Sequence, residues 1–140
     1  MNRLIRHIRR YPLTLLCIAT VVYLSLFKPP TIDRSLLFPG YDKCVHILMY
    51  GGTCSVLWGE YLRSHLRLSR PRLIAWAIVA PILLGGLIEI AQETLTTYRG
   101  GDWADFAANS TGVLLAACVG RFVLPRCGKL FRPRTDTSNR

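Results

Sequence analysis

The sequence has few acidic residues and lacks the short motifs that mark the common catalytic sites of soluble enzymes. Its 140 residues include 8 Asp and Glu against 18 Lys and Arg. It contains no Gly-rich phosphate loop, no GxSxG turn, no HExxH pair and no CxxC pair. Since 51% of its residues are hydrophobic, intrinsic disorder is excluded, and its length leaves room for one domain.

Charge is also absent from four long stretches of the chain. Residues 11–27, 44–59, 73–88 and 106–120 contain no Asp, Glu, Lys or Arg. A helix in water needs a polar face, which these stretches cannot supply. Extended by their flanks they reach the length of a membrane span. We therefore expect an all-α membrane protein with four transmembrane helices, near 11–28, 43–62, 72–92 and 103–124. A cleaved signal peptide is the alternative for the first stretch, although Phe27-Lys28-Pro29-Pro30 is no small-residue cleavage site.

The basic residues predict the orientation of these helices. Fourteen lie in the N-terminus, the 63–72 loop and the tail after 120, whereas the loops 28–43 and 93–102 hold four. Because Lys and Arg are retained on the cytoplasmic side, both termini should be cytoplasmic. The domain plan is then a basic N-terminus (1–10), a four-helix bundle (11–124) and a basic tail (125–140). Basic residues that flank spans favour contact with membrane lipids over nucleic acid.

Polar residues gather at the three helix ends that this topology places on the outer side. At the start of the second helix Asp42, His46 and Tyr50 share one face, with Lys43 beside them. Glu89, Gln92 and Glu93 share a face at the end of the third helix. The fourth begins with a stripe after Arg99: Asp102, Asp105 and Asn109. Polar groups at such depth need partners or water, so three stripes predict one site.

Each of these residues also has a purely structural interpretation. Asp42 and Asp102 are suited to capping the two helices that they open. Glu93 could be a solvated charge, and Lys43 and Tyr50 could be anchors at headgroup depth. A hydrogen-bonded network of helix ends would account for the rest, which are His46, Glu89, Gln92, Asp105 and Asn109.

These motifs, in this order, resemble the VanZ-like family, named for a teicoplanin-resistance protein. The second helix opens with Asp42-Lys43-x-x-His46-x-x-x-Tyr50, and the third closes with Gly86-x-x-Glu89-x-x-Gln92. The fourth opens with Arg99-x-x-Asp102-x-x-Asp105-x-x-x-Asn109-x-x-Gly112. The resemblance covers about residues 40–120 and the preceding helix. It implies a multi-pass protein of the bacterial cytoplasmic membrane, in a family associated with glycopeptide resistance.

Two functions remain open at this point. In the first, the outer site binds or modifies an envelope headgroup, a lipid-linked sugar or a glycopeptide. Its catalytic form would use Glu89 or Asp105 as base or metal ligand and His46 as acid–base partner or ligand, since burial can tune such groups. Ligand contacts would come from the remaining polar residues: Asp42, Lys43, Tyr50, Gln92, Arg99, Asp102 and Asn109.

The second function is a non-catalytic assembly module, in which the same network fixes helix register and docks a partner. The sequence does not decide whether the protein is an enzyme, whether it uses a divalent metal or what its oligomeric state is. Four short helices leave little room for a transport pathway.

Overall fold

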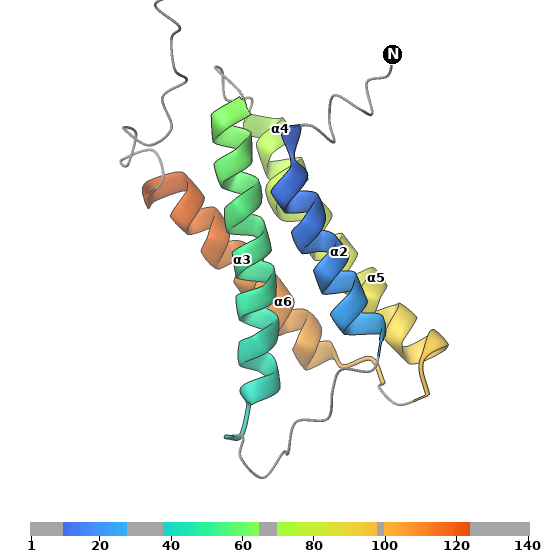
Figure 1. Ribbon diagram of the computed structural model, residues 1–140. Helices are drawn as coiled ribbons and strands as arrows, with labels where there is room; N and C mark the ends of the chain where they lie inside the picture. Colours follow the sequence, from blue (N-terminus) through green and yellow to red (C-terminus); the bar gives the residue numbers. More distant parts are fainter. Residues whose placement is uncertain (1–9, 28–37, 65–69, 98–99, 124–140) are drawn as a thin grey trace, which may run out of the picture.

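The computed structural model describes residues 10–27, 38–64, 70–97 and 100–123, and these form four helices without strands. Figure 1 shows them as a bundle in which consecutive helices run in opposite directions. The first is α2 (Pro12–Leu26) and the second is α3 (Tyr41–Ser64). The third combines α4 (Arg70–Ile74), η2 (Ala75–Val79) and α5 (Ala80–Leu95), and the fourth combines α6 (Trp103–Cys118) and η3 (Val119–Val123).

α2 is held at its start by a side chain from the neighbouring helix. Pro12 stands in its first turn, where a missing backbone N–H costs nothing. The carboxylate of Glu60 in α3 accepts hydrogen bonds from the backbone N–H groups of Leu13 and Thr14 and from the Thr14 hydroxyl, at 2.7 to 3.1 Å. An acid from another helix therefore satisfies the open donors of α2.

The third helix contains one wide π turn directly before a proline. The backbone N–H of Ala80 donates to Ala75, five residues back, at the end of η2. Pro81 follows and has no N–H for the carbonyl of Ala77. The wider turn absorbs this interruption, and the helix continues through α5 to Leu95.

Glycines let α3 and α6 approach closely. A Cβ on Gly112 would lie 2.5 Å from the carbonyl oxygen of Ile47 and 2.9 Å from the backbone nitrogen of Gly51. A Cβ on Gly120 would overlap the ring of Trp58. At Gly112 the two helices thus pack backbone against backbone, whereas Gly120 in η3 leaves room for the ring of Trp58.

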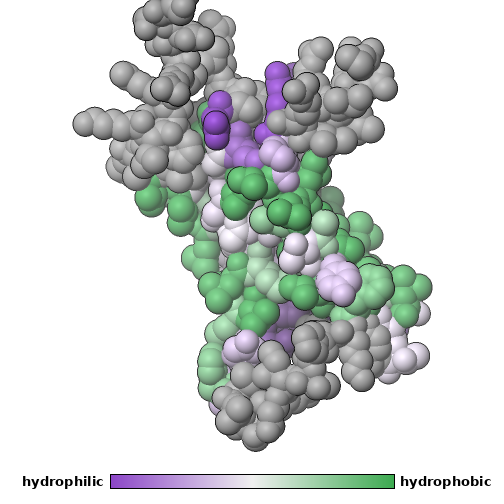
Figure 2. All heavy atoms as spheres, in the orientation of Figure 1, coloured by the Kyte–Doolittle hydropathy of each residue, from purple (hydrophilic) through white to green (hydrophobic). Residues whose placement is uncertain are grey.

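The core is narrow, and much of the apolar surface faces outward. One cluster of buried residues lies among the helices and consists of Val21, Tyr50, Cys54, Ile88, Val113 and Ala116. Large side chains such as Leu16, Leu83 and Leu87 are more than half exposed. Figure 2 shows hydrophobic side chains across the middle of one face, with hydrophilic ones gathered where α2 begins and α3 ends.

Two helices of the described part are long and apolar enough to cross a membrane, namely Pro71–Leu95 and Trp103–Val123. α2 is apolar but shorter, with 15 residues. The expected all-helical class is confirmed, and the predicted helices overlap the observed ones. The first is shorter than predicted, whereas α3 begins at Tyr41 and extends to Ser64. The tail 125–140 and most of the segment 1–10 lie outside the described residues.

Candidate functional site

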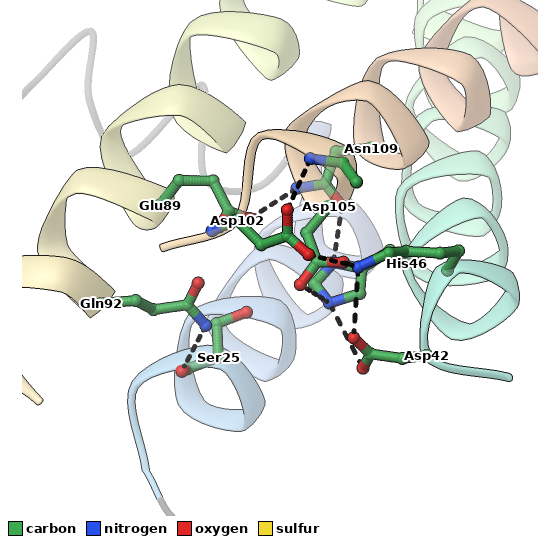
Figure 3. Close-up of polar contacts among 10 residues, drawn as sticks. Ser25, Asp42, His46, Glu89, Gln92, Asp102, Asp105 and Asn109 are labelled. Carbon is green, nitrogen blue, oxygen red and sulfur yellow. Dashed lines mark hydrogen bonds and ion pairs between the residues drawn. The ribbon is translucent and has the colours of Figure 1, made fainter. Parts of the chain in front are cut away.

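Three helix ends bring the polar residues together at one end of the bundle. α3 and α6 begin there and α5 ends there, as Figure 3 shows for the side chains. We call this group the polar network. It consists of Asp42, Lys43 and His46 from α3, Glu89 from α5, and Asp102, Asp105 and Asn109 from α6 with its cap.

Lys43 joins α3 to the first turn of α6. Its Nζ lies 2.6 Å from Oδ2 of Asp102, donates to Oδ1 of Asp105, and lies 3.7 Å from Asp42. Asp105 is buried, so its charge needs a partner, which the ammonium supplies. Lys43, predicted as a ligand contact with a membrane anchor as the alternative, therefore forms interhelical ion pairs in the structure.

Asp102 is both a helix cap and a partner of Lys43. Its Oδ1 accepts the backbone N–H of Ala104 at 2.8 Å, which confirms the capping interpretation. The hydrogen bond from Lys43, followed by that from Ala104, lowers the pKa of Asp102 below its ordinary value of 3.8. Asp42, in contrast, lies in the first turn of α3, because that helix begins one residue before it.

His46, Asn109 and Glu89 form a buried chain across three helices. Nδ1 of His46 lies 2.9 Å from Oδ1 of Asn109, and Nδ2 of Asn109 donates to Oε1 of Glu89 at 3.3 Å. The other carboxylate oxygen of Glu89 accepts the backbone N–H of Asp102 at 3.1 Å. All three side chains are buried, so the chain fixes the relative positions of α3, α5 and α6.

The second ring nitrogen of His46 faces carboxylates. Its Nε2 lies 3.5 Å from Oδ2 of Asp105 and 3.8 Å from Oδ1 of Asp42. One ligand atom from each of these three residues falls within 4.8 Å of the others, a spacing that can hold a metal ion. Because Lys43 already binds Asp105, a metal would share this carboxylate with the ammonium or displace it.

The Gly100-Gly101 segment lies between the end of α5 and the start of α6 and contacts Glu89 and Glu93. The backbone N–H of Gly101 donates to Glu93 at 2.8 Å, so Glu93 is more than a solvated charge. A Cβ on Gly101 would lie 2.6 Å from the carbonyl oxygen of Glu89, which a side chain could not tolerate. This close approach places the N-terminus of α6 beside Glu89.

The other predicted site residues lie apart from the network or outside the described residues. Gln92 is fully buried and donates to the backbone carbonyl of Ser25, which ties α5 to α2. Tyr50 is buried, and its hydroxyl has no hydrogen-bond partner among the described residues. Arg99 lies outside the described residues. The role of Ser25 could not be read from sequence, because its backbone carbonyl makes the contact.

Formal negative charge dominates the described side chains of the site. Five carboxylates gather with the single ammonium of Lys43: Asp42, Glu89, Glu93, Asp102 and Asp105. Trp103 follows Asp102 and is 81% exposed. Carboxylates accept hydrogen bonds from hydroxyl and ammonium groups, and an exposed ring offers an apolar face. The arrangement therefore suits a hydroxyl-rich or amine-bearing ligand better than an anion.

The chain matches no protein-family model, no curated protein and no solved structure.

Proposed function

We propose that this chain is a VanZ-like integral membrane protein of the bacterial cytoplasmic membrane. In this proposal its outer-face site binds the sugar or amine part of an envelope headgroup, a lipid-linked sugar or a glycopeptide. The observation that carries the proposal is the meeting of Lys43, His46, Glu89 and Asp105 from three helix ends in one network.

The dimensions and surface of the bundle support a membrane location for all four helices. At about 1.5 Å per residue, the 24 residues of α3 extend about 36 Å, enough to cross the hydrocarbon layer. α2, with 15 residues, extends about 22 Å and would need its flanks or a local thinning of the bilayer. Exposed leucines such as Leu16, Leu83 and Leu87 would then face lipid rather than water.

The direction of the helices supports the proposed topology. α2 begins and η3 ends at the same end of the bundle, where α3 also ends (Figure 1). In the sequence, basic residues concentrate before α2, in the loop that follows α3 and after residue 120. From the positive-inside rule we propose that this end is cytoplasmic and that the polar network lies at the outer face.

A binding experiment with a matched control tests the proposed site. The fluorescence of the protein in detergent would be titrated with teicoplanin and, separately, with a chitin oligosaccharide. We expect saturable binding of at least one probe by the wild type, and its loss in Asp102→Asn. Cys44→Ser changes an exposed neighbour of Lys43 and should bind as the wild type does. Equal binding by all three proteins, or no saturable binding of either probe, would contradict the proposed site.

One observation favours the assembly module as a second candidate. Many polar groups of the network form hydrogen bonds with each other, since Lys43 binds two carboxylates and Asn109 bridges His46 and Glu89. Under this proposal, His46→Ala, Glu89→Gln and Asp105→Asn should all lower the unfolding midpoint sharply. Neutral or raised midpoints would instead favour a ligand site, because such sites are often built at the expense of stability.

A further inference from the structure

A cavity lies away from the polar network, between α2, α3 and the third helix. It has a volume of about 380 Å³, within the usual range for ligand pockets. Its lining is largely apolar and includes Ile18, Val21, Leu57, Trp76 and Leu84. Tyr50 is the one residue that lines it and was also predicted for the outer site.

The cavity is elongated along the helix axes. On α3 its lining runs from Tyr50 to Tyr61, which at about 1.5 Å per residue corresponds to about 16 Å. On the third helix it runs a similar distance, from Arg72 to Leu84. A long, narrow and apolar space fits an aliphatic chain better than a compact polar molecule.

One end of this cavity carries the guanidinium of Arg72, which forms no ion pair with the described acidic residues. Arg72 lines the cavity at the end where Tyr11 and Tyr61 also lie, and it has no acidic partner among the described residues. Glu60, the acid of α3 at this end, binds the start of α2. A guanidinium free of carboxylates offers paired donors to a phosphate.

We propose that this cavity binds an anionic phospholipid, with one acyl chain between α2, α3 and α5 and the phosphate at Arg72. In the proposed topology this end faces the cytoplasm, where basic pockets between transmembrane helices bind anionic headgroups. The lipid site lies at the opposite end from the proposed outer site and does not depend on what that site binds.

Native mass spectrometry of the detergent-purified protein tests this proposal with two lipids of identical acyl chains. Phosphatidylglycerol and phosphatidylcholine would each be titrated into the wild type and four variants. Arg72→Gln removes the cation, and Arg63→Gln is its control, an exposed arginine of α3 outside the cavity lining. Ala80→Phe fills the cavity, whereas Leu83→Phe enlarges an exposed neighbour that does not line it.

We expect the wild type to prefer phosphatidylglycerol, and Arg72→Gln to reduce that preference roughly fivefold while Arg63→Gln leaves it unchanged. Ala80→Phe should weaken binding of both lipids, and Leu83→Phe should not. Equal affinity of the wild type for the two lipids, or equal effects of the two arginine variants, would overturn the proposal. If Ala80→Phe does not fold, the arginine pair still decides the result. If neither teicoplanin nor the chitin oligosaccharide binds the outer site, the result for the lipid site still stands.

Discussion

Nδ1 of His46 lies 2.9 Å from Oδ1 of Asn109, so this ring nitrogen faces a hydrogen-bond acceptor. The amide nitrogen of Asn109 is committed to Glu89, so its carbonyl oxygen must be the atom that faces the ring. Nδ1 therefore donates a hydrogen bond to this oxygen, and Nε2 faces the carboxylates of Asp42 and Asp105. A ring held in this way offers only Nε2 to a metal ion.

The tautomer of His46 can be measured directly. In protein with 15N-labelled histidine, we expect NMR of the His46 ring to show a protonated Nδ1. Asn109→Leu removes the acceptor and should shift the Nδ1 resonance. It should also cost about 1–3 kcal/mol of stability, because buried groups of His46 and Glu89 lose partners. His46→Gln assigns the signal among the three histidines. An Nδ1 without a proton in the wild type would contradict the assignment.

Removal of the Lys43 ammonium should destabilise the bundle. In Lys43→Met the buried carboxylate of Asp105 loses the charge that lies against it. We expect a loss of about 1–3 kcal/mol in denaturant unfolding, less than for a fully buried pair because Lys43 is partly exposed. The double variant Lys43→Met/Asp105→Asn should recover part of this loss. A double variant less stable than Lys43→Met alone would count against the pair.

Stability should depend on pH through Asp102. Because its pKa is lowered in the folded protein, Asp102 stabilises the fold above its ordinary pKa of 3.8. This contribution is lost as the pH falls through the lower folded value. We therefore expect the unfolding midpoint to fall as the pH is lowered from about 5 through 3.8 and below. Asp102→Asn should flatten this dependence, and an unchanged slope would refute the assignment.

The contact between α3 and α6 offers a paired glycine test. Gly112→Ala places a methyl group against the carbonyl of Ile47 and should cost about 1–3 kcal/mol. Gly52→Ala is the control, because a Cβ there meets nothing within 4 Å. That variant should be neutral or stabilise the helix by up to about 1 kcal/mol. Thermal unfolding in detergent compares the two, and equal midpoints would show that the helices do not approach this closely.

Lys43 should also limit the binding of metal at Asp42, His46 and Asp105. Its ammonium binds one of the carboxylates that a metal would need. We expect Lys43→Met to bind Zn²⁺ more tightly than the wild type does in calorimetric titration. Adding His46→Gln to that variant should abolish the gain. If Lys43→Met shows no increase in Zn²⁺ affinity, the ammonium does not limit metal binding at these three residues. Their role as metal ligands then loses support.

The sequence predicts the helices and the location of the network because both follow from short spacings. Charge-free stretches mark the helices, and i, i+4 spacing aligns Asp42 with His46 in α3. The pairing of side chains across helices could not be predicted, since spacing along one helix does not reveal which residue of another helix lies opposite. Lys43, for example, was expected at the site as a ligand contact or as a membrane anchor, and its pairing with Asp102 and Asp105 was not predicted.

Other features left weaker signals in the sequence. The π turn before Pro81 replaces the simple kink that a proline suggests. The contact of Glu60 with Leu13 and Thr14 was not predicted, although a lone acid at the end of an apolar stretch was a signal for it. Gln92 was placed in the site by its spacing from Glu89, but its amide is directed to α2.

The Glu60 contact also bears on the order of events during synthesis. α2 leaves the ribosome with its first amide groups open, and the carboxylate that accepts them follows 46 residues after Thr14. Until Glu60 has been made, the described structure offers no side chain that accepts hydrogen bonds from the backbone N–H groups of Leu13 and Thr14. The first turn of α2 is therefore capped only after nearly all of α3 has been translated, although α2 and α3 can already pack through Val21, Tyr50 and Cys54.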